Sequence, residues 1–226
     1  VAAAAEIAHA RGALLHCDAV QAAGRLDVPA EAAGADFIAV SAHKPGGPAG
    51  VGALVLGAGV SLEPQRGGGQ ELGRRAGTEN LVGIAGFGAA AALAVPDAAE
   101  LQRLDALRRR LEEGVRSVCP QAVVHGEAAR RAAGTSCIGM PGVSAETQLM
   151  SFDLAGVAVS AGAACSSGKV SASHVLRAMG VTEAEARCAV RVSFGWGTEA
   201  SDIDRLIASW TDLHRRTGAR RVGDAA

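Results

Sequence analysis

The sequence predicts an α/β fold over residues 1–95, followed by a smaller α+β part over residues 96–226. Two observations support this prediction. Short apolar segments bounded by turn residues alternate with segments of helical periodicity, which is typical of strand–helix–strand layers. With 226 residues the chain is also long enough to bury a sizeable core. We expect two domains, joined by long helices around residue 95.

The first part begins with a predicted helix over residues 1–11, which ends at Arg11 and Gly12 because a basic last turn followed by glycine stops helices. The order strand, helix, strand then predicts a parallel pair. The expected elements are a strand in 13–20 ending near Asp18, a short helix in 29–35 closed by Gly34, and strands in 36–43 and 51–57.

The second part alternates short strands with helices. An alanine-rich helix from Asn80 to about Ala94 precedes it, and a leucine-faced charged helix opens it. The expected helices are 98–118, 144–156, 173–180 and Asp202 to about Arg216, and the expected strands are 122–126, 135–140, 157–162 and 188–195. We expect the tail, residues 218–226, to be disordered.

Composition excludes several classes of function. The net charge is −1, from 22 basic and 23 acidic residues, so neither nucleic acid nor an anionic membrane is an expected partner. No apolar run is long enough to span a bilayer. Five widely spaced cysteines without a paired motif favour a reducing, cytoplasmic location, and we find no metal-ligand cluster. The chain opens at Val1 without methionine, and we expect the start of the protein to be missing.

The strongest group of polar residues follows two neighbouring predicted strands: Asp18 with Gln21, then Ser41, His43 and Lys44. In α/β sheets of this kind, ligand-binding residues lie at the carboxyl ends of the strands. A buried lysine has a lowered pKa and forms Schiff bases, and an aspartate keeps a pyridine nitrogen protonated. The group therefore suits pyridoxal phosphate. Taken singly, these residues also have ordinary structural explanations. Lys44 can be a solvent-exposed lysine, Asp18 can cap a helix, and the glycines and proline after Lys44 can form an ordinary turn. A Walker-type loop is excluded because here the glycines follow the lysine.

Cys165 differs from the other cysteines in its surroundings. A free cysteine is ordinarily a small buried apolar residue, and this interpretation suits Cys17, Cys137 and Cys188. The sequence SAGAACSSGK around Cys165 contains only small or polar residues and predicts a mobile, accessible loop. Because a nucleophilic thiolate needs access as well as a suitable pKa, we expect Cys165 to be a nucleophile.

Arg191 stands alone between valines in an alternating segment, VRVSFG. It is either a residue of an edge strand or a clamp for a carboxylate, which a guanidinium group binds through two parallel hydrogen bonds.

Five motifs in order now resemble a known family: HCDAVQAAGR, SAHKPGGPAGVGALVL, GGGQELGRRAGTEN, SAGAACSSGKVSASHVLRAMG and VRVSFG. They are similar to the cysteine desulfurases of the NifS/IscS type, within the class V aminotransferases. The resemblance implies a fold-type I pyridoxal phosphate enzyme. It also implies that the chain is the carboxyl part of the large mixed-sheet domain plus the small C-terminal domain.

The resemblance further implies a reaction and a role for each residue. L-cysteine becomes L-alanine, and its sulfur stays on an enzyme cysteine as a persulfide. Matched by motif, Lys44 holds the cofactor aldehyde, Cys165 is the nucleophile and Arg191 binds the substrate carboxylate. The remaining cofactor contacts are Asp18 on the pyridine nitrogen, Gln21 on the ring hydroxyl, Ser41 and His43 on the phosphate, and Thr78 on the phosphate of the other subunit of a homodimer. The implied partner is a sulfur acceptor or an iron–sulfur scaffold protein.

Two other interpretations stay open. One is another class V enzyme, either a selenocysteine lyase or a transaminase, although Cys165 argues against a plain transaminase. The other is a non-catalytic fragment or sulfur-carrier module. Small departures from the family, such as SAGAAC in place of a more serine-rich run, remove no chemical group that the reaction needs.

Overall fold

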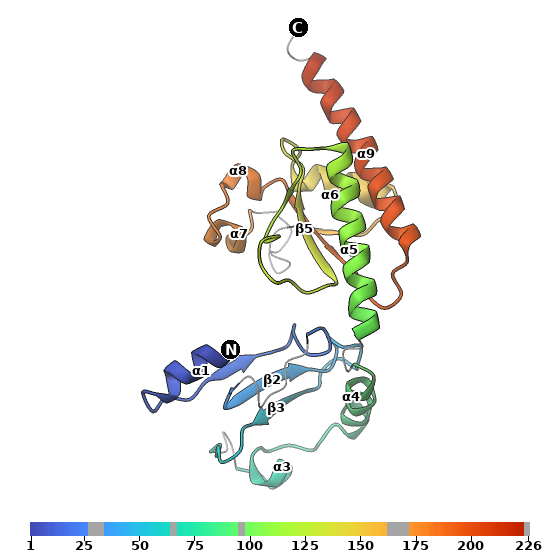
Figure 1. Cartoon of the computed structure of the whole chain (residues 1–226). Helices are drawn as coiled ribbons and strands as arrows, with labels where there is room; N and C mark the ends of the chain where they lie inside the picture. Colours follow the sequence, from blue (N-terminus) through green and yellow to red (C-terminus); the bar gives the residue numbers. More distant parts are fainter. Residues whose placement is uncertain (27–33, 64–66, 95–97, 162–171, 224–226) are drawn as a thin grey trace. The chain divides into compact units, whose positions relative to one another are not determined.

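The computed structural model describes residues 1–26, 34–63, 67–94, 98–161 and 172–223 (Figure 1). The chain divides into two compact units, Val1–Asp97 and Ala98–Ala226, each of which is described by itself. The domain roles expected from the sequence for these two parts stay predictions.

Unit 1 is built on a three-stranded mixed sheet in the order β1-β2-β3. Its elements are α1 (Ala2–His9), β1 (His16–Asp18), β2 (Phe37–Ser41), β3 (Gly52–Leu56), α3 (Gln70–Gly73) and α4 (Leu81–Leu93) (Figure 1). β1 and β2 run parallel, which confirms the predicted pair, whereas β3 is antiparallel to β2. Most of the helix predicted in 29–35 lies outside the described residues.

The buried core of unit 1 is small. It consists of Ala19, Ala35 and Ile38, with four half-buried neighbours. Asn80 begins α4, because its side chain accepts a hydrogen bond from the Gly83 N–H at 3.0 Å. Large apolar side chains of β3 and α4 are exposed among the described residues: Leu54, Val55, Leu81, Val82, Ile84 and Leu93. Packing in this unit is therefore concentrated around β1 and β2.

Unit 2 has an antiparallel four-stranded sheet in the order β4-β5-β7-β6. Its strands are β4 (Val123–Val124), β5 (Thr135–Gly139), β6 (Ser160–Ala161) and β7 (Ala189–Ser193). Its helices are α5 (Ala98–Val118), α6 (Ala145–Leu154), α7 (His174–Ala178), α8 (Glu183–Ala186) and α9 (Ala200–Gly223) (Figure 1).

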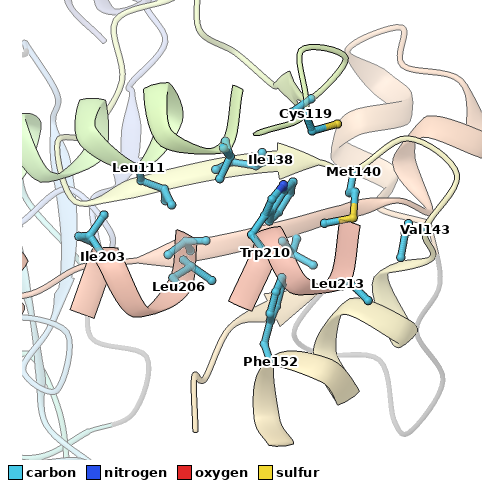
Figure 2. Close-up of a cluster of buried hydrophobic side chains, with 14 of the residues drawn as sticks. Leu111, Cys119, Ile138, Met140, Val143, Phe152, Ile203, Leu206, Trp210 and Leu213 are labelled. Atoms are coloured by element: carbon cyan, nitrogen blue, oxygen red, sulfur yellow. The ribbon is translucent and has the colours of Figure 1, made fainter. Parts of the chain in front are cut away.

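The two faces of this sheet are covered differently. On one face, Ile138, Val190 and Val192 join a large core with side chains of α5, α6 and α9. In this core, shown in Figure 2, the rings of Phe152 and Trp210 stack with centroids 6.0 Å apart. On the other face, a smaller cluster joins the sheet residues Cys137 and Ala189 to α7 and α8.

Several sequence-based boundaries were wrong. α9 continues through Gly223, so residues 218–223 are helical rather than disordered. Arginine and alanine are good helix formers, and extending an anchored helix costs little because each added residue gains a hydrogen bond. The sequence interpretation also missed α8, which begins with a capping box at Thr182 and Glu185. α3 was missed as well, the strand predicted in 122–126 contains only two residues, and among the described residues of 157–162 only Ser160 and Ala161 form a strand.

Within the described ranges, no single helix combines the length and the apolar character needed to cross a membrane. Among the described residues, the helices Leu81–Leu93 and Ala98–Val118 reach the length and apolar composition of a membrane span only when they are taken together, and this pair is bent.

Candidate active site

The parallel pairing of β1 and β2 brings two predicted site residues to one edge of the unit 1 sheet. Asp18 is opposite Ala39, and the Ala19 N–H donates to the Ala39 carbonyl at 2.9 Å. Asp18 ends β1 and Ser41 ends β2. Since parallel strands point the same way, both residues lie at the carboxyl edge, where α/β sheets carry their sites.

The residues after β2 form a tight turn. Ser41 Oγ lies 2.8 Å from His43 Nδ1, and the Lys44 N–H donates to the Ser41 carbonyl at 3.3 Å. The turn is closed by the Gly47 N–H, which donates to the Ala42 carbonyl at 2.8 Å. A Cβ atom at position 47 would also lie only 2.8 Å from the same oxygen, so the turn requires glycine there. The turn holds Ser41, His43 and Lys44 beside the strand end.

The expected burial of Lys44 is not found. Its side chain is half-buried. The role of Lys44 in holding a cofactor stays a prediction. Lys44 forms no ion pair within the described residues, which leaves the amine available to a ligand.

Asp18 and Gln21 are exposed and make local contacts. Asp18 Oδ1 accepts a hydrogen bond from the Val20 N–H at 3.1 Å, and Gln21 Oε1 accepts one from Arg25 Nη1 at 3.3 Å. The Asp18 contact fixes the first turn after β1 and keeps the carboxylate at the sheet edge.

Thr78 belongs to a different segment of unit 1. It is exposed and lies between Gly77, whose φ is 92°, and the start of α4. Among the described residues it makes no side-chain hydrogen bond with Asp18, Ser41, His43 or Lys44. Its role at the phosphate of a partner subunit stays a prediction.

Arg191 lies on β7, the strand between β5 and β6, so the edge-strand interpretation of this residue is wrong. It is directly opposite Cys137 on β5 and Ser160 on β6. Its side chain is exposed, while Val190 and Val192 point into the core. Burial raises the pKa of the Cys137 thiol, and the charge of Arg191 lowers it only in part.

Cys165, the predicted nucleophile, lies outside the described residues, as does the accessible loop predicted around it. In sequence it follows Ala161, the last residue of β6, by four positions. Ser160 was not singled out from the sequence, because only the register of β6 against β7 places it opposite Arg191. In the part of the chain that is described, no three His, Cys, Asp or Glu side chains gather as a metal site.

The chain belongs to the class V aminotransferase family, whose sequence profile, described as "Aminotransferase class-V", matches residues 1–206. Within that family it is a homologue of the cysteine desulfurases. It is 47% identical to the "Cysteine desulfurase" of Cereibacter sphaeroides over 204 residues, which are 90% of this chain and 52% of that protein. It is 41% identical to the enzyme of the same name from Klebsiella pneumoniae, over 91% of this chain and 52% of that protein.

Solved structures agree with this assignment and confirm the α/β fold. The NifS-like protein from Rickettsia africae ESF-5 matches with a TM-score of 0.83 and 33% identity, over 95% of this chain and 57% of that one. DndA from Streptomyces lividans matches with a TM-score of 0.65 and 33% identity, over 85% of this chain and 55% of that one. The resemblance seen in the sequence motifs is confirmed. The chain spans about half the length of the relatives it matches.

The family depends on pyridoxal phosphate, and the chemistry of the β1–β2 edge fits this cofactor. Lys44 offers an amine that is free of ion pairs, Asp18 offers a carboxylate, and Ser41 and His43 offer a hydroxyl and an imidazole 2.8 Å apart. These groups match an aldehyde, a pyridine nitrogen and a phosphate, respectively.

Proposed function

We propose that this chain contributes the central residues of a pyridoxal phosphate-dependent cysteine desulfurase, which converts L-cysteine to L-alanine and leaves sulfur on Cys165. The observation that carries the proposal is the carboxyl edge of β1 and β2, where Asp18 ends β1 and where Ser41, His43 and Lys44 stand at the end of β2. The homology to cysteine desulfurases supports it.

Six residues would hold the cofactor. Lys44 binds its aldehyde carbon, Asp18 its pyridine nitrogen and Gln21 its ring hydroxyl. Ser41 and His43 bind its phosphate, and Thr78 reaches the phosphate bound by the partner subunit of a homodimer. When bound, pyridoxal phosphate supplies an electron sink that stabilises negative charge at the substrate Cα.

The protein's own groups then divide the chemistry. The Lys44 amine accepts the Cα proton, and Arg191 holds the substrate carboxylate. Cys165, as a thiolate, attacks the substrate sulfur. The new S–S bond forms as the Cβ–S bond breaks, the electron pair of the Cβ–S bond stays on Cβ, which takes up a proton, and Lys44 returns a proton to Cα. One thiol and one cysteine thus give one persulfide and one alanine, with no external oxidant or reductant.

Sulfur transfer also needs an acceptor. A persulfide on Cys165 is itself open to attack by another thiolate, which would release Cys165 for the next cycle. The proposed partner is therefore a protein with an accessible thiol, such as a sulfur acceptor or an iron–sulfur scaffold. The proposed location is the cytoplasm.

The cofactor role of Lys44 is tested on the purified chain mixed with pyridoxal phosphate. We expect borohydride reduction to fix the cofactor covalently, and peptide mass spectrometry to locate it on Lys44. The Lys44→Ala variant should trap none. Trapping at another lysine, or unchanged trapping in Lys44→Ala, would remove Lys44 from the proposal.

The nucleophile is tested separately. Cys165→Ala should keep the trapped cofactor but reduce alanine and persulfide formation from L-cysteine to background, whereas the matched control Cys188→Ala should keep both. Undiminished desulfuration by Cys165→Ala would contradict the proposed role. Comparing alanine yields from cysteine and selenocysteine in the same assay separates a desulfurase from a selenocysteine lyase.

A further inference from the structure

Arg191 lies on the same face of the unit 2 sheet as α7 and α8, and it has no counter-ion within the described part of this unit. α7 and α8 cover this face around Cys137 and Ala189, whereas Arg191 remains exposed. Within residues 98–161 and 172–223, no aspartate or glutamate pairs with it. All five arginines of α5 pair with a carboxylate. Arg191 differs from them, because no carboxylate of the described part of unit 2 competes with an external anion for it.

Ser160 shares this face with Arg191. Ala161, the next residue of β6, packs against the large core and pairs with Val190, which is also in that core. Because side chains alternate along a strand, Ser160 lies on the opposite face, together with its pairing partner Arg191. Directly opposed residues of antiparallel strands have Cβ atoms about 4.5–5.5 Å apart. The two side chains can therefore reach one small ligand.

Neither neighbour of Arg191 neutralises it. Ser160 carries no charge, and partial burial raises the pKa of the half-buried Cys137 thiol, so this thiol stays neutral at pH 7. A carboxylate has about four lone-pair sites, and the guanidinium fork uses two of them. One more donor on the same face can therefore bind the same carboxylate, and Ser160 provides a hydroxyl there.

We propose that the Ser160 hydroxyl donates a hydrogen bond to the carboxylate that Arg191 binds, so that β6 and β7 together orient the substrate. This inference rests on the proposed function, in which Arg191 holds the α-carboxylate of an amino acid. It adds a second binding residue on a neighbouring strand. It also predicts that an acidic side chain at position 160 blocks the site, because it would pair with Arg191 itself.

The test uses the full ¹⁵N-labelled chain without cofactor. The Arg191 Nε–Hε signal is assigned by its loss in Arg191→Lys and followed during titration with L-alanine. L-alaninol, which lacks the carboxylate, is the control ligand. We expect L-alanine alone to shift the signal. Ser160→Ala should raise the dissociation constant by about ten- to a hundredfold, the effect of one lost hydrogen bond to a charged group, and Ser160→Thr should restore it.

Ser160→Asp should shift the Arg191 signal without ligand and abolish the response to L-alanine. Ser201→Asp is the matched control, because it adds the same charge on α9, which packs on the other face of the sheet. Thermal unfolding checks that each variant folds. An unchanged dissociation constant in folded Ser160→Ala would overturn the inference.

The outcomes separate the two proposals. A Ser160 effect on L-alanine binding in a chain that does not desulfurate cysteine would support the inference and contradict the proposed function. If L-alanine shifts the Arg191 signal with the same dissociation constant in the wild type and in Ser160→Ala, the inference is overturned and the proposed function is unaffected. No response of Arg191 to L-alanine would remove both roles in carboxylate binding.

Discussion

Glu112 is a buried carboxylate that ties α5 to its sheet. Its side chain accepts hydrogen bonds from Arg131 at 2.8 and 3.2 Å, from Ser136 at 2.7 Å and from Arg108 at 3.0 Å. Burial by itself raises the pKa of Glu112, but the hydrogen bonds from Arg131 and Ser136 and the charges of both arginines outweigh it and lower the pKa. The ionised form is therefore the one that stabilises unit 2.

Replacing Glu112 by Gln should destabilise unit 2 by about 3 kcal/mol at pH 7, because the largely buried Arg131 loses its counter-charge and Arg108 keeps only its pair with Asp105. A carboxylate with a lowered pKa stabilises above its unfolded pKa, and this stabilisation is lost as the pH falls through the folded pKa. The difference between wild type and Glu112→Gln should therefore shrink below about pH 4.5. Urea unfolding over a pH series measures both effects.

The matched control for this prediction is Glu113→Gln, at the exposed neighbouring position on the same helix. It should change the free energy of unfolding by less than about 0.5 kcal/mol. Equal losses in the two variants would show that the Glu112 pairs do not stabilise the fold.

Among the secondary-structure elements, the pair α5 and α9 depends on close approach at Gly114. A Cβ atom there would lie 2.4 Å from Ile207 Cδ1 and 3.0 Å from its Cγ1. Glycine in a helix interior costs about 1 kcal/mol relative to alanine, yet here it lets the two helices pack. The contact joins two elements that together supply much of the core.

Gly114→Val should destabilise the protein by about 1–3 kcal/mol, the usual cost of overpacking. Gly218→Val, on α9, is the control, because nothing lies within 4 Å of a Cβ atom at that position. Thermal and urea unfolding give the two free energies. A neutral Gly114→Val would mean that Ile207 moves aside without cost.

At the scale of the whole molecule, the two units differ in how many apolar side chains they bury. The large core of unit 2 includes side chains from three helices and two strands. The core of unit 1 consists of only three buried residues, Ala19, Ala35 and Ile38, with four half-buried neighbours. Since apolar burial supplies most of the free energy that opposes local opening, the sheet of unit 2 should be the more resistant of the two.

Hydrogen exchange followed by mass spectrometry tests this contrast in the full chain. Amides of β5 and β7 should exchange at least about ten times more slowly than those of β1 and β2, because opening the unit 2 sheet exposes its large core. Equal protection of the two sheets would contradict the view that unit 2 carries most of the stability.

Local sequence patterns were sufficient to predict much of the candidate site at the β1–β2 edge. Alternating strand and helix signals predicted the parallel pair, and a parallel pair necessarily brings Asp18 and Ser41 to one edge. The partial burial of Lys44 could not be predicted in the same way, because it depends on which other segments cover the turn. The register of Ser160 against Arg191 likewise depends on the strand beside it.

Motifs were sufficient to identify the family and its dependence on pyridoxal phosphate, and periodicity was sufficient for most helices and strands, because both are local properties of the chain. The position of Arg191 on an interior strand, with Cys137 on one side and Ser160 on the other, became known only from the strand order and register. Strand order and register arise from hydrogen bonds and packing between segments far apart in sequence. For that reason, the proposed partner of Arg191 emerged only from the fold.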